Sequence, residues 1–328
     1  MNKEAYYKPS GKISGLYILL FLLCSVISIP ILSFAYIYLN YYIPIIYILF
    51  FITIGCGAIF GYLMSIAAKL GKARNPAVVI GCTLIGTALF KYVQWCFYIP
   101  LVLNKSYEVY YYSFGQELSF LEQVTEAFYF FIEPAAVLDG ALFINEYGVW
   151  GIGNSGDTVA GIFLAIVWLV EFLVIAGMAS LMCRDWPGRP YSEESNGWYT
   201  QMETIYEMDS PANFDGMKIS LESGNVEEFI ALLREGVSNP LNFLRLTFFK
   251  PPAPSHTEPY YMNIDHIFVD DKNKDNTATL VNYLAVSTHN ANAIFTAEPI
   301  AQTYEETPVY EEIEDTNESD AQNEFDEE

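Results

Sequence analysis

Long apolar runs separated by short polar segments fill the first 183 residues of the chain. Crossing a bilayer as a helix takes about 20 predominantly apolar residues. Four runs reach that length, approximately Leu16–Leu39, Ile45–Ala67, Ala77–Leu101 and Ala160–Met182. The first is longer than the roughly 7–15 apolar residues of a signal-peptide core and ends at no small-residue cleavage site, so we expect it to be retained. The pattern predicts a four-helix transmembrane domain over residues 16–183.

Basic residues lie at alternate ends of these runs. Lys3, Lys8 and Lys12 precede the first, Lys69, Lys72 and Arg74 follow the second, and Arg184 and Arg189 follow the fourth. Lys and Arg concentrate on the cytoplasmic side of membrane proteins. We therefore expect a multi-pass protein of the bacterial inner membrane, with both its N-terminus (residues 1–15) and its C-terminus in the cytoplasm.

The outer segment, residues 104–159, connects the third and fourth runs. Apolar residues recur within it at spacings of three and four between Leu118 and Phe131, with Glu122 and Glu126 among the residues between them. This spacing is typical of an amphipathic helix, which we expect to lie on the outer membrane surface.

Residues 127–144 leave an alternative open, because they are apolar enough to form a re-entrant segment or a fifth span. Glu133, Pro134 and Asp139 lie near their middle, and such residues are unfavourable in lipid. A fifth span would place the C-terminal part of the chain outside the cell.

Two ionisable residues interrupt the apolar runs. Lys91 and Glu171 lie roughly 21 and 18 Å from the cytoplasmic surface, at about 1.5 Å per helical residue. A lone charge at mid-bilayer costs at least about 2.5–3.5 kcal/mol, so we expect an ion pair, with Gln94 one turn beyond Lys91. The pair has three interpretations: a structural contact, a Lys91 that extends its ammonium to the interface, or a proton, ion or substrate site.

The second run carries small residues at intervals of four, at Gly57, Gly61 and Ser65. Such spacing lets helix backbones approach closely. It indicates helix packing, either within one chain or between the chains of a homo-oligomer.

The C-terminal half alternates between short elements. Residues 216–236 are typical of a helical unit that stops at Gly236, and three strand-like runs follow at Asn242–Lys250, Tyr260–Val269 and Thr277–Val286. We predict a cytoplasmic α+β domain over residues 184–303, with an antiparallel meander of about three strands. Residues 304–328 hold 12 Asp+Glu and no Lys or Arg, which predicts a disordered acidic tail.

The composition and charge of the chain argue against several classes of function. Hydrophobic residues make up 52% and charged residues 17%, and the net charge is −23. This acidity argues against a nucleic-acid partner, since phosphate binding needs Lys and Arg. All five cysteines precede residue 184, three histidines are widely spaced, and Ser192 and Ser195 have the spacing of a zinc-binding pair without its thiols. We expect no disulfide, no metal and no cofactor.

Several short motifs together resemble an uncharacterised group of multi-pass bacterial inner-membrane proteins. They are the Tyr/Pro-rich N-terminus, Lys72-Ala-Arg-Asn75, Lys91-Tyr-Val-Gln-Trp95, Trp150, and Trp168 with Glu171. Some members of the group carry a Cys-x-x-Cys pair where this chain has Ser192 and Ser195. The resemblance covers mostly residues 1–200 and implies a membrane topology, not an activity.

No nucleophile–base pair or nucleotide motif is apparent, so we expect no enzymatic activity. The leading hypothesis is a membrane-anchored interaction or scaffold protein, embedded in the lipid bilayer, that binds a cytoplasmic protein through residues 184–328. The alternative is a small transporter or channel component that uses Lys91 and Glu171, for which a homo-oligomer would supply the enclosed volume that four helices lack.

Overall fold

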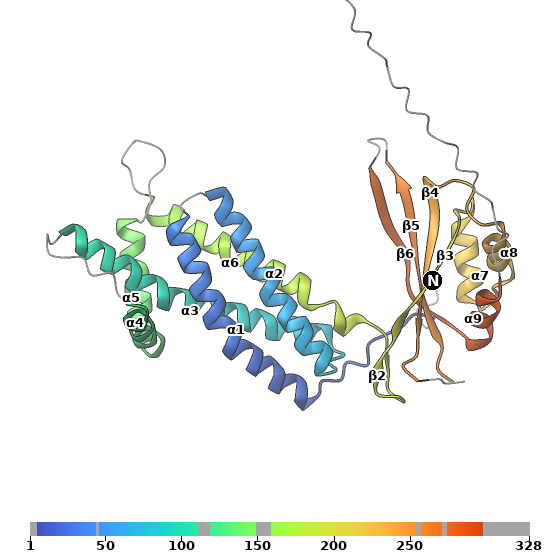
Figure 1. Ribbon diagram of the computed structural model, residues 1–328, viewed down its shortest axis with the longest axis horizontal. Helices are drawn as coiled ribbons and strands as arrows, with labels where there is room; N and C mark the ends of the chain where they lie inside the picture. The colour runs from blue at the N-terminus through green and yellow to red at the C-terminus, as the bar shows by residue number, and fades with distance from the viewer. Residues whose placement is uncertain are drawn as a thin grey trace, which may run out of the picture.

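The computed structural model describes residues 5–43, 46–110, 119–148, 159–253, 257–270 and 274–297, without the side chains of residues 46 and 104–110. The chain forms an elongated molecule with a helical bundle at one end and a sheet domain at the other (Figure 1). The predicted tail and Trp150 lie outside the described residues.

Four helices are long and apolar enough to cross a membrane, as the apolar runs predict. They are α1 (Gly15–Tyr42), α2 (Ile46–Leu70), α3 (Pro76–Tyr110) and α6 (Gly161–Cys183). α3 continues through Pro100 beyond the end expected for it, into the predicted outer segment. Among the described residues, these four are the single helices that meet the length and hydropathy criteria for a span.

The bundle is apolar outside as well as inside. Its interior is built on aromatic side chains such as Tyr17, Phe60 and Phe90, all fully buried. On its outside, Val26 and Ile85 are 72% and 70% exposed. A helix that is apolar all round needs apolar surroundings on its outer side too, so this surface fits lipid better than water.

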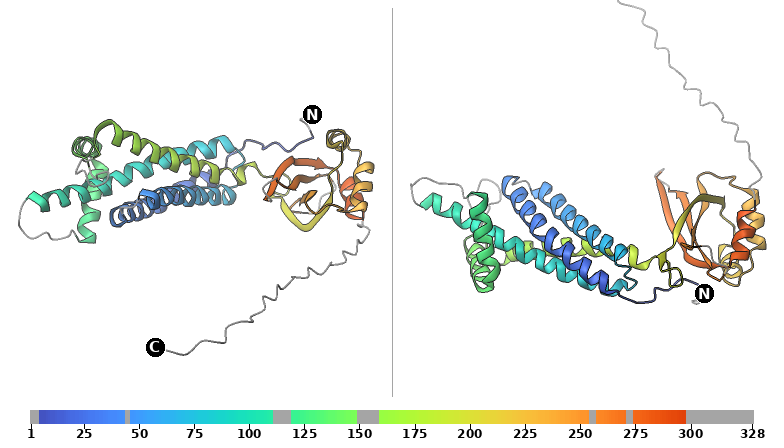
Figure 2. Two further views of the ribbon diagram at one scale, coloured as in Figure 1. Left: turned by 90° about the horizontal axis from the view of Figure 1, so that it is seen from above. Right: turned by 60° about the horizontal axis from the view of Figure 1, so that its bottom comes forward.

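Within the predicted outer segment, residues 120–147 form two short helices, α4 (Phe120–Ile132) and α5 (Pro134–Tyr147), which meet at an angle of 107°. α4 begins with a capping box between Ser119 and Glu122, and Pro134 opens α5. The pair lies at the end of the bundle farthest from the sheet domain (Figure 2). Residues 127–144 therefore belong to two helices with a sharp bend between them, a broken span or a re-entrant loop by shape.

The sheet domain contains four antiparallel strands in the order β3-β4-β5-β6. β4 (Asn242–Lys250) and β5 (Tyr260–Val269) have the predicted bounds, and β6 (Asp275–Val286) begins two residues earlier than expected. The three predicted strands form the expected antiparallel meander, and a fourth strand that was not predicted, β3 (Thr200–Asp209), pairs with β4. β3 is a polar edge strand with one buried residue, Met208, so its sequence lacks the usual apolar alternation.

Three helices cover one face of this sheet: α7 (Phe214–Glu222), α8 (Glu227–Glu235) and α9 (Thr288–Phe295) (Figure 1). The helical unit expected over residues 216–236 consists of α7 and α8. Phe229 and Leu233 of α8 meet Phe248 of β4 and Ile264 of β5 in a single buried cluster. Successive side chains of a strand point to opposite faces of the sheet, and the helices cover the face that carries the buried ones.

Two connections join the sheet domain to the bundle. The chain before α1 pairs with β6, because Ala285 N donates to Ala5 O at 2.8 Å and Tyr7 N donates to Tyr283 O at 2.9 Å. After α6, a 3₁₀ turn η1 (Trp186–Gly188) leads to a small hairpin of β1 (Tyr191–Ser192) and β2 (Gly197–Trp198). Both connections run along the same end of the bundle, so the sheet domain is held at two points.

Candidate functional site

The two predicted intramembrane charges meet between α3 and α6. Lys91 Nζ lies 2.9 Å from Glu171 Oε2. The side chains are 17% and 30% exposed, so most of the surface around the pair is covered by apolar helices. An ion pair in such surroundings is weakly screened by solvent, and each charge offsets the desolvation cost of the other.

Other helices bring polar groups to the same place. Tyr36 of α1 lies with its hydroxyl 3.2 Å from Thr53 Oγ1 of α2. The hydroxyls of Tyr36 and of Tyr98 on α3 both lie close enough to interact electrostatically with Glu171. All four long helices therefore contribute to one polar cluster, defined here as Tyr36, Thr53, Lys91, Tyr98 and Glu171.

Gln94 is buried beside this polar cluster and is not bonded to it. Its side chain is 2% exposed, and neither its amide nitrogen nor its amide oxygen has a hydrogen-bond partner in the described part of the chain. Sequence spacing placed Gln94 one turn from Lys91, but the structure does not bring the amide into contact with the ion pair.

An aromatic pair packs next to the polar cluster, because Phe90 contacts the ring of Tyr36. The rings of Phe60 and Phe90 stack with centroids 6.2 Å apart and planes 11° apart. Phe60 lies between Thr53 and the end of α2, and Phe90 precedes Lys91 on α3. Both rings are fully buried in the interior of the bundle.

The small residues of α2 are used for packing within the chain. A methyl group at Gly57 would lie 2.8 Å from the Ile175 carbonyl oxygen of α6, and one at Gly61 would overlap the Ala179 backbone. Ser65 is also buried. The side of α2 that carries these residues therefore faces α6 of the same chain.

A second cluster lies where the bundle meets the sheet domain. Trp186, Trp198 and Tyr191 form successive edge-on ring contacts, with centroids 5.6 and 4.9 Å apart. Lys69 Nζ and Arg189 Cζ lie 4.2 and 4.3 Å from the centre of the Trp186 ring, and Arg74 Cζ lies 4.5 Å from that of Tyr191. The Trp198 indole also donates to the Lys69 carbonyl oxygen at 2.9 Å. Cation–π contacts and ring packing therefore fix the hairpin to the end of α2.

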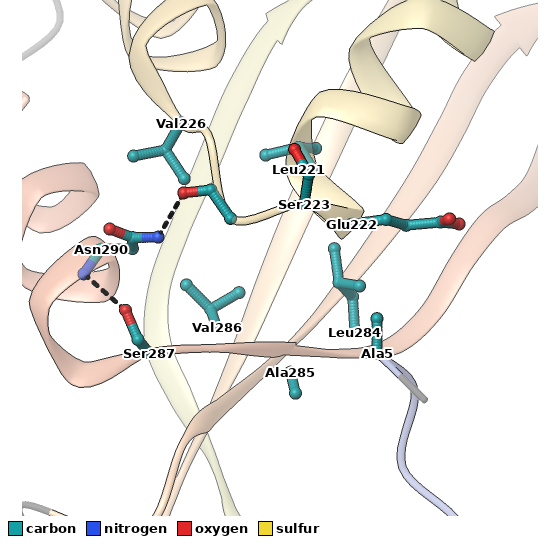
Figure 3. Close-up of a pocket in the computed structure, with 11 residues that line it drawn as sticks. Ala5, Leu221, Glu222, Ser223, Val226, Leu284, Ala285, Val286, Ser287 and Asn290 are labelled. Carbon is teal, nitrogen blue, oxygen red and sulfur yellow. Dashed lines mark hydrogen bonds between the residues drawn. The ribbon is translucent and has the colours of Figure 1, made fainter. Parts of the chain in front are cut away.

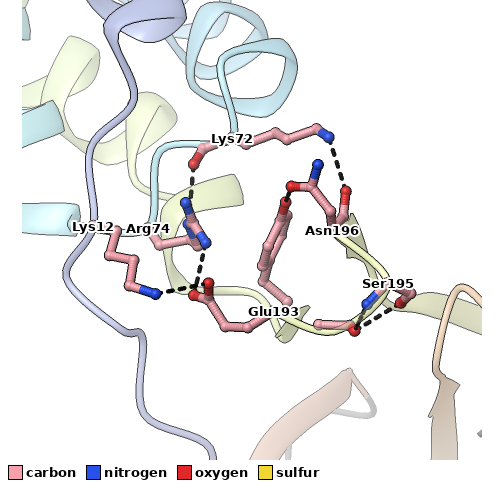
Figure 4. Close-up of polar contacts among 8 residues, drawn as sticks. Lys12, Lys72, Arg74, Glu193, Ser195 and Asn196 are labelled. Atoms are coloured by element: carbon pink, nitrogen blue, oxygen red, sulfur yellow. Dashed lines mark hydrogen bonds and ion pairs between the residues drawn. The ribbon is translucent and has the colours of Figure 1, made fainter.

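Glu193 adds ion pairs to this junction (Figure 4). Its carboxylate accepts from Lys12 Nζ at 3.0 Å and from Arg74 Nη1 at 2.6 Å. A hydrogen bond from Ser10, together with Lys12 and Arg74, lowers the pKa of Glu193 to about 2. One carboxylate thus links the N-terminal segment, the turn after α2 and the β1–β2 hairpin.

Ser192 and Ser195 occupy the tip of the same hairpin. Ser195 donates to Ser192 Oγ from its backbone N–H at 2.8 Å and from its hydroxyl at 2.7 Å. Within the described residues, no three His, Cys, Asp or Glu side chains are grouped to hold a metal ion. The hairpin is closed by its own hydrogen bonds.

The pattern of the sequence did not predict the contacts at this junction. Trp186, Trp198 and Glu193 follow the fourth apolar run in the sequence, whereas their partners come from the turn at Lys69–Arg74. Tryptophan beside basic residues at the end of an apolar run was the available signal, since both favour the membrane interface.

The sheet domain also contains a shallow groove of about 350 Å³ between the N-terminal segment, α7, β6 and α9 (Figure 3). Asn290 at its edge donates to Gly224 O at 2.8 Å. Polar and apolar groups both line the groove, and Glu222 is the one charged side chain among them. Glu222 already accepts a hydrogen bond from the Tyr6 hydroxyl at 2.8 Å.

Comparison of the chain with family models, curated proteins and solved structures returned no match.

Proposed function

We propose that this chain is a multi-pass integral membrane protein without enzymatic activity, which holds a small α+β domain at the cytoplasmic face of the membrane as a protein-binding scaffold. The junction is the observation that carries this proposal. Two separate connections, a three-ring contact and the Glu193 ion pairs fix the sheet domain to the ends of the helices. A domain that was only tethered to the membrane would not need these contacts, so we infer that its position at the membrane matters for its function.

The first test is the side of the membrane on which residue 328 lies. A C-terminal epitope should resist protease in intact cells and be cleaved after permeabilisation. An epitope inserted after Gly148, between α5 and α6, should behave in the opposite way. Cleavage of the C-terminal epitope in intact cells would refute the cytoplasmic placement.

The second test addresses the partner. Crosslinking in cells and affinity purification should recover a defined protein with the full chain, and should lose it when residues 200–328 are removed. Recovery of the same set of proteins with and without these residues would contradict the scaffold proposal. A chain ending at residue 303 separates the contribution of the acidic tail from that of the sheet domain.

The polar cluster supports a second candidate, a small transporter or channel component. Its basis is the Lys91–Glu171 pair, with groups from four helices around it. In liposomes, Glu171→Gln should abolish proton or ion flux while the protein remains folded. Equal flux in protein-containing and protein-free liposomes would exclude this candidate. We rank transport second because the stacked, fully buried rings of Phe60 and Phe90 fill interior space next to the polar cluster.

A further inference from the structure

Basic residues outnumber acidic ones at the end of the bundle that meets the sheet domain. Lys12, Lys69, Lys72, Arg74, Arg184 and Arg189 gather there. Asp185 and Glu193 pair with Lys12, Arg74 and Arg189, whereas Glu194 is oriented to Thr257 of the sheet domain. Within the described residues, Lys69, Lys72 and Arg184 form no ion pair with a carboxylate. This excess of positive charge lies on an otherwise strongly acidic protein.

Two of these cations are held against one aromatic ring. Lys69 Nζ and Arg189 Cζ both lie beside the Trp186 indole, so the sum of their distances to its centre, 8.5 Å, is the largest separation that they can have. Trp198 packs against the same ring. We name Lys69, Trp186, Arg189 and Trp198 the junction cluster. Asp185 already pairs with Arg189 at 2.6 Å, and no carboxylate of the described residues pairs with Lys69, so this group of side chains keeps a net positive charge.

The position of the junction cluster indicates which anion fits. It lies at the C-terminal ends of α2 and α6, where apolar helix gives way to polar chain. Both tryptophans are partly exposed, as amphipathic rings are at the level of lipid headgroups. Lys and Arg at this level attract anionic lipids, each contributing roughly fivefold in affinity.

We propose that the junction cluster binds the phosphate headgroup of an anionic glycerophospholipid in the adjoining leaflet. Lys69 and Arg189 contact the phosphate oxygens, while Trp186 and Trp198 lie along the glycerol backbone and the first methylene groups. The inference rests on the proposed membrane insertion, but not on the identity of a protein partner. It makes the lipid a third component of the contact between bundle and sheet domain.

The test uses the full chain, purified in a neutral detergent. Binding of dihexanoyl phosphatidylglycerol, dihexanoyl phosphatidylcholine and inorganic phosphate is measured by thermophoresis. We expect phosphatidylglycerol to bind at least about tenfold more tightly than phosphatidylcholine, and its affinity to fall as salt is raised. The variant with Lys69→Gln and Arg189→Gln should bind it roughly 25-fold more weakly, because two cations are lost.

Controls separate charge from folding. Arg234→Gln removes an exposed cation of α8 on the sheet domain and should leave lipid binding unchanged. Lys69→Arg keeps the positive charge and should retain lipid binding. It keeps the proposal testable if the double variant does not fold. Equal binding of the two lipids, or an equal loss of binding in Arg234→Gln, would overturn the proposal.

Two further results would also overturn it. Inorganic phosphate that binds as tightly as phosphatidylglycerol would indicate a soluble anion as the ligand. Lipid binding that appears only in a chain ending at residue 303 would show that the acidic tail occupies the junction cluster instead. Failure of the epitope test with lipid selectivity intact would refute the cytoplasmic placement alone.

Discussion

Lys91 Nζ and Glu171 Oε2 lie 2.9 Å apart across the contact between α3 and α6. The pair ties the helix that begins beside the sheet domain to the helix that ends beside it. In apolar surroundings, loss of either partner leaves a charge without compensation, whereas loss of both leaves none.

Lys91→Met and Glu171→Leu should each destabilise the folded bundle by about 2–3 kcal/mol, less than the roughly 3–5 kcal/mol typical of fully buried pairs because both side chains are partly exposed. The double variant should recover part of this loss. Accumulation in membranes and unfolding in mixed micelles measure the effect. A double variant as unstable as the worse single variant would show that the contact contributes nothing to stability.

Gly61→Ala should destabilise the bundle by about 1–3 kcal/mol, because the added methyl group overlaps the Ala179 backbone of α6 and forces the helices apart. Gly55→Ala is the matched control in the same helix. Nothing lies within 4 Å of a methyl group there, so this variant should be neutral or gain about 0.5–1 kcal/mol from helix propensity. Thermal unfolding in detergent compares the two. Similar melting temperatures would contradict the close contact of α2 with α6.

The junction should weaken in acid. The folded pKa of Glu193, about 2, lies below its usual value of 4.5, so its ion pairs contribute fully above pH 4.5 and are lost as the pH falls towards 2. Glu193→Gln should therefore cost about 0.5–1 kcal/mol at pH 7, a modest value because the side chain is 43% exposed. The difference in stability between this variant and the native chain should shrink as the pH is lowered from 5 to 3. Glu194→Gln serves as the control, and an unchanged difference across this range would contradict the assignment.

Removal of residues 1–9 should leave the edge of β6 unpaired, because Ala5 and Tyr7 supply its outer backbone hydrogen bonds. We expect a lower melting temperature of the sheet domain and concentration-dependent association through the exposed edge. Differential scanning calorimetry and size-exclusion chromatography measure both.

The matched control for this truncation is Tyr6→Phe. It keeps the backbone pairing and loses only the hydroxyl contact with Glu222, at about 1 kcal/mol. A truncated chain that melts like the native protein and stays monomeric would show that the N-terminal segment does not protect this edge.

The local pattern of residues was sufficient to predict the long apolar helices and two of the strands in the sheet domain. The apolar runs predicted four helices because a run of this length that is apolar on all sides is typical of a helix in apolar surroundings. The buried residues of β4 and β5 follow from the burial of one face of the sheet. Matched depth within the runs was also enough to suggest that Lys91 faces Glu171.

Tertiary structure alone decided the contacts between distant segments. β3 is a strand because β4 offers it a free edge, since its own residues are mostly polar. The convergence of Tyr36, Thr53 and Tyr98 near Glu171 depends on how four helices are rotated about their axes, which local apolar periodicity leaves undetermined when every side is apolar. The stacking of Lys69 and Arg189 on Trp186 likewise exists only once the ends of α2 and α6 are side by side.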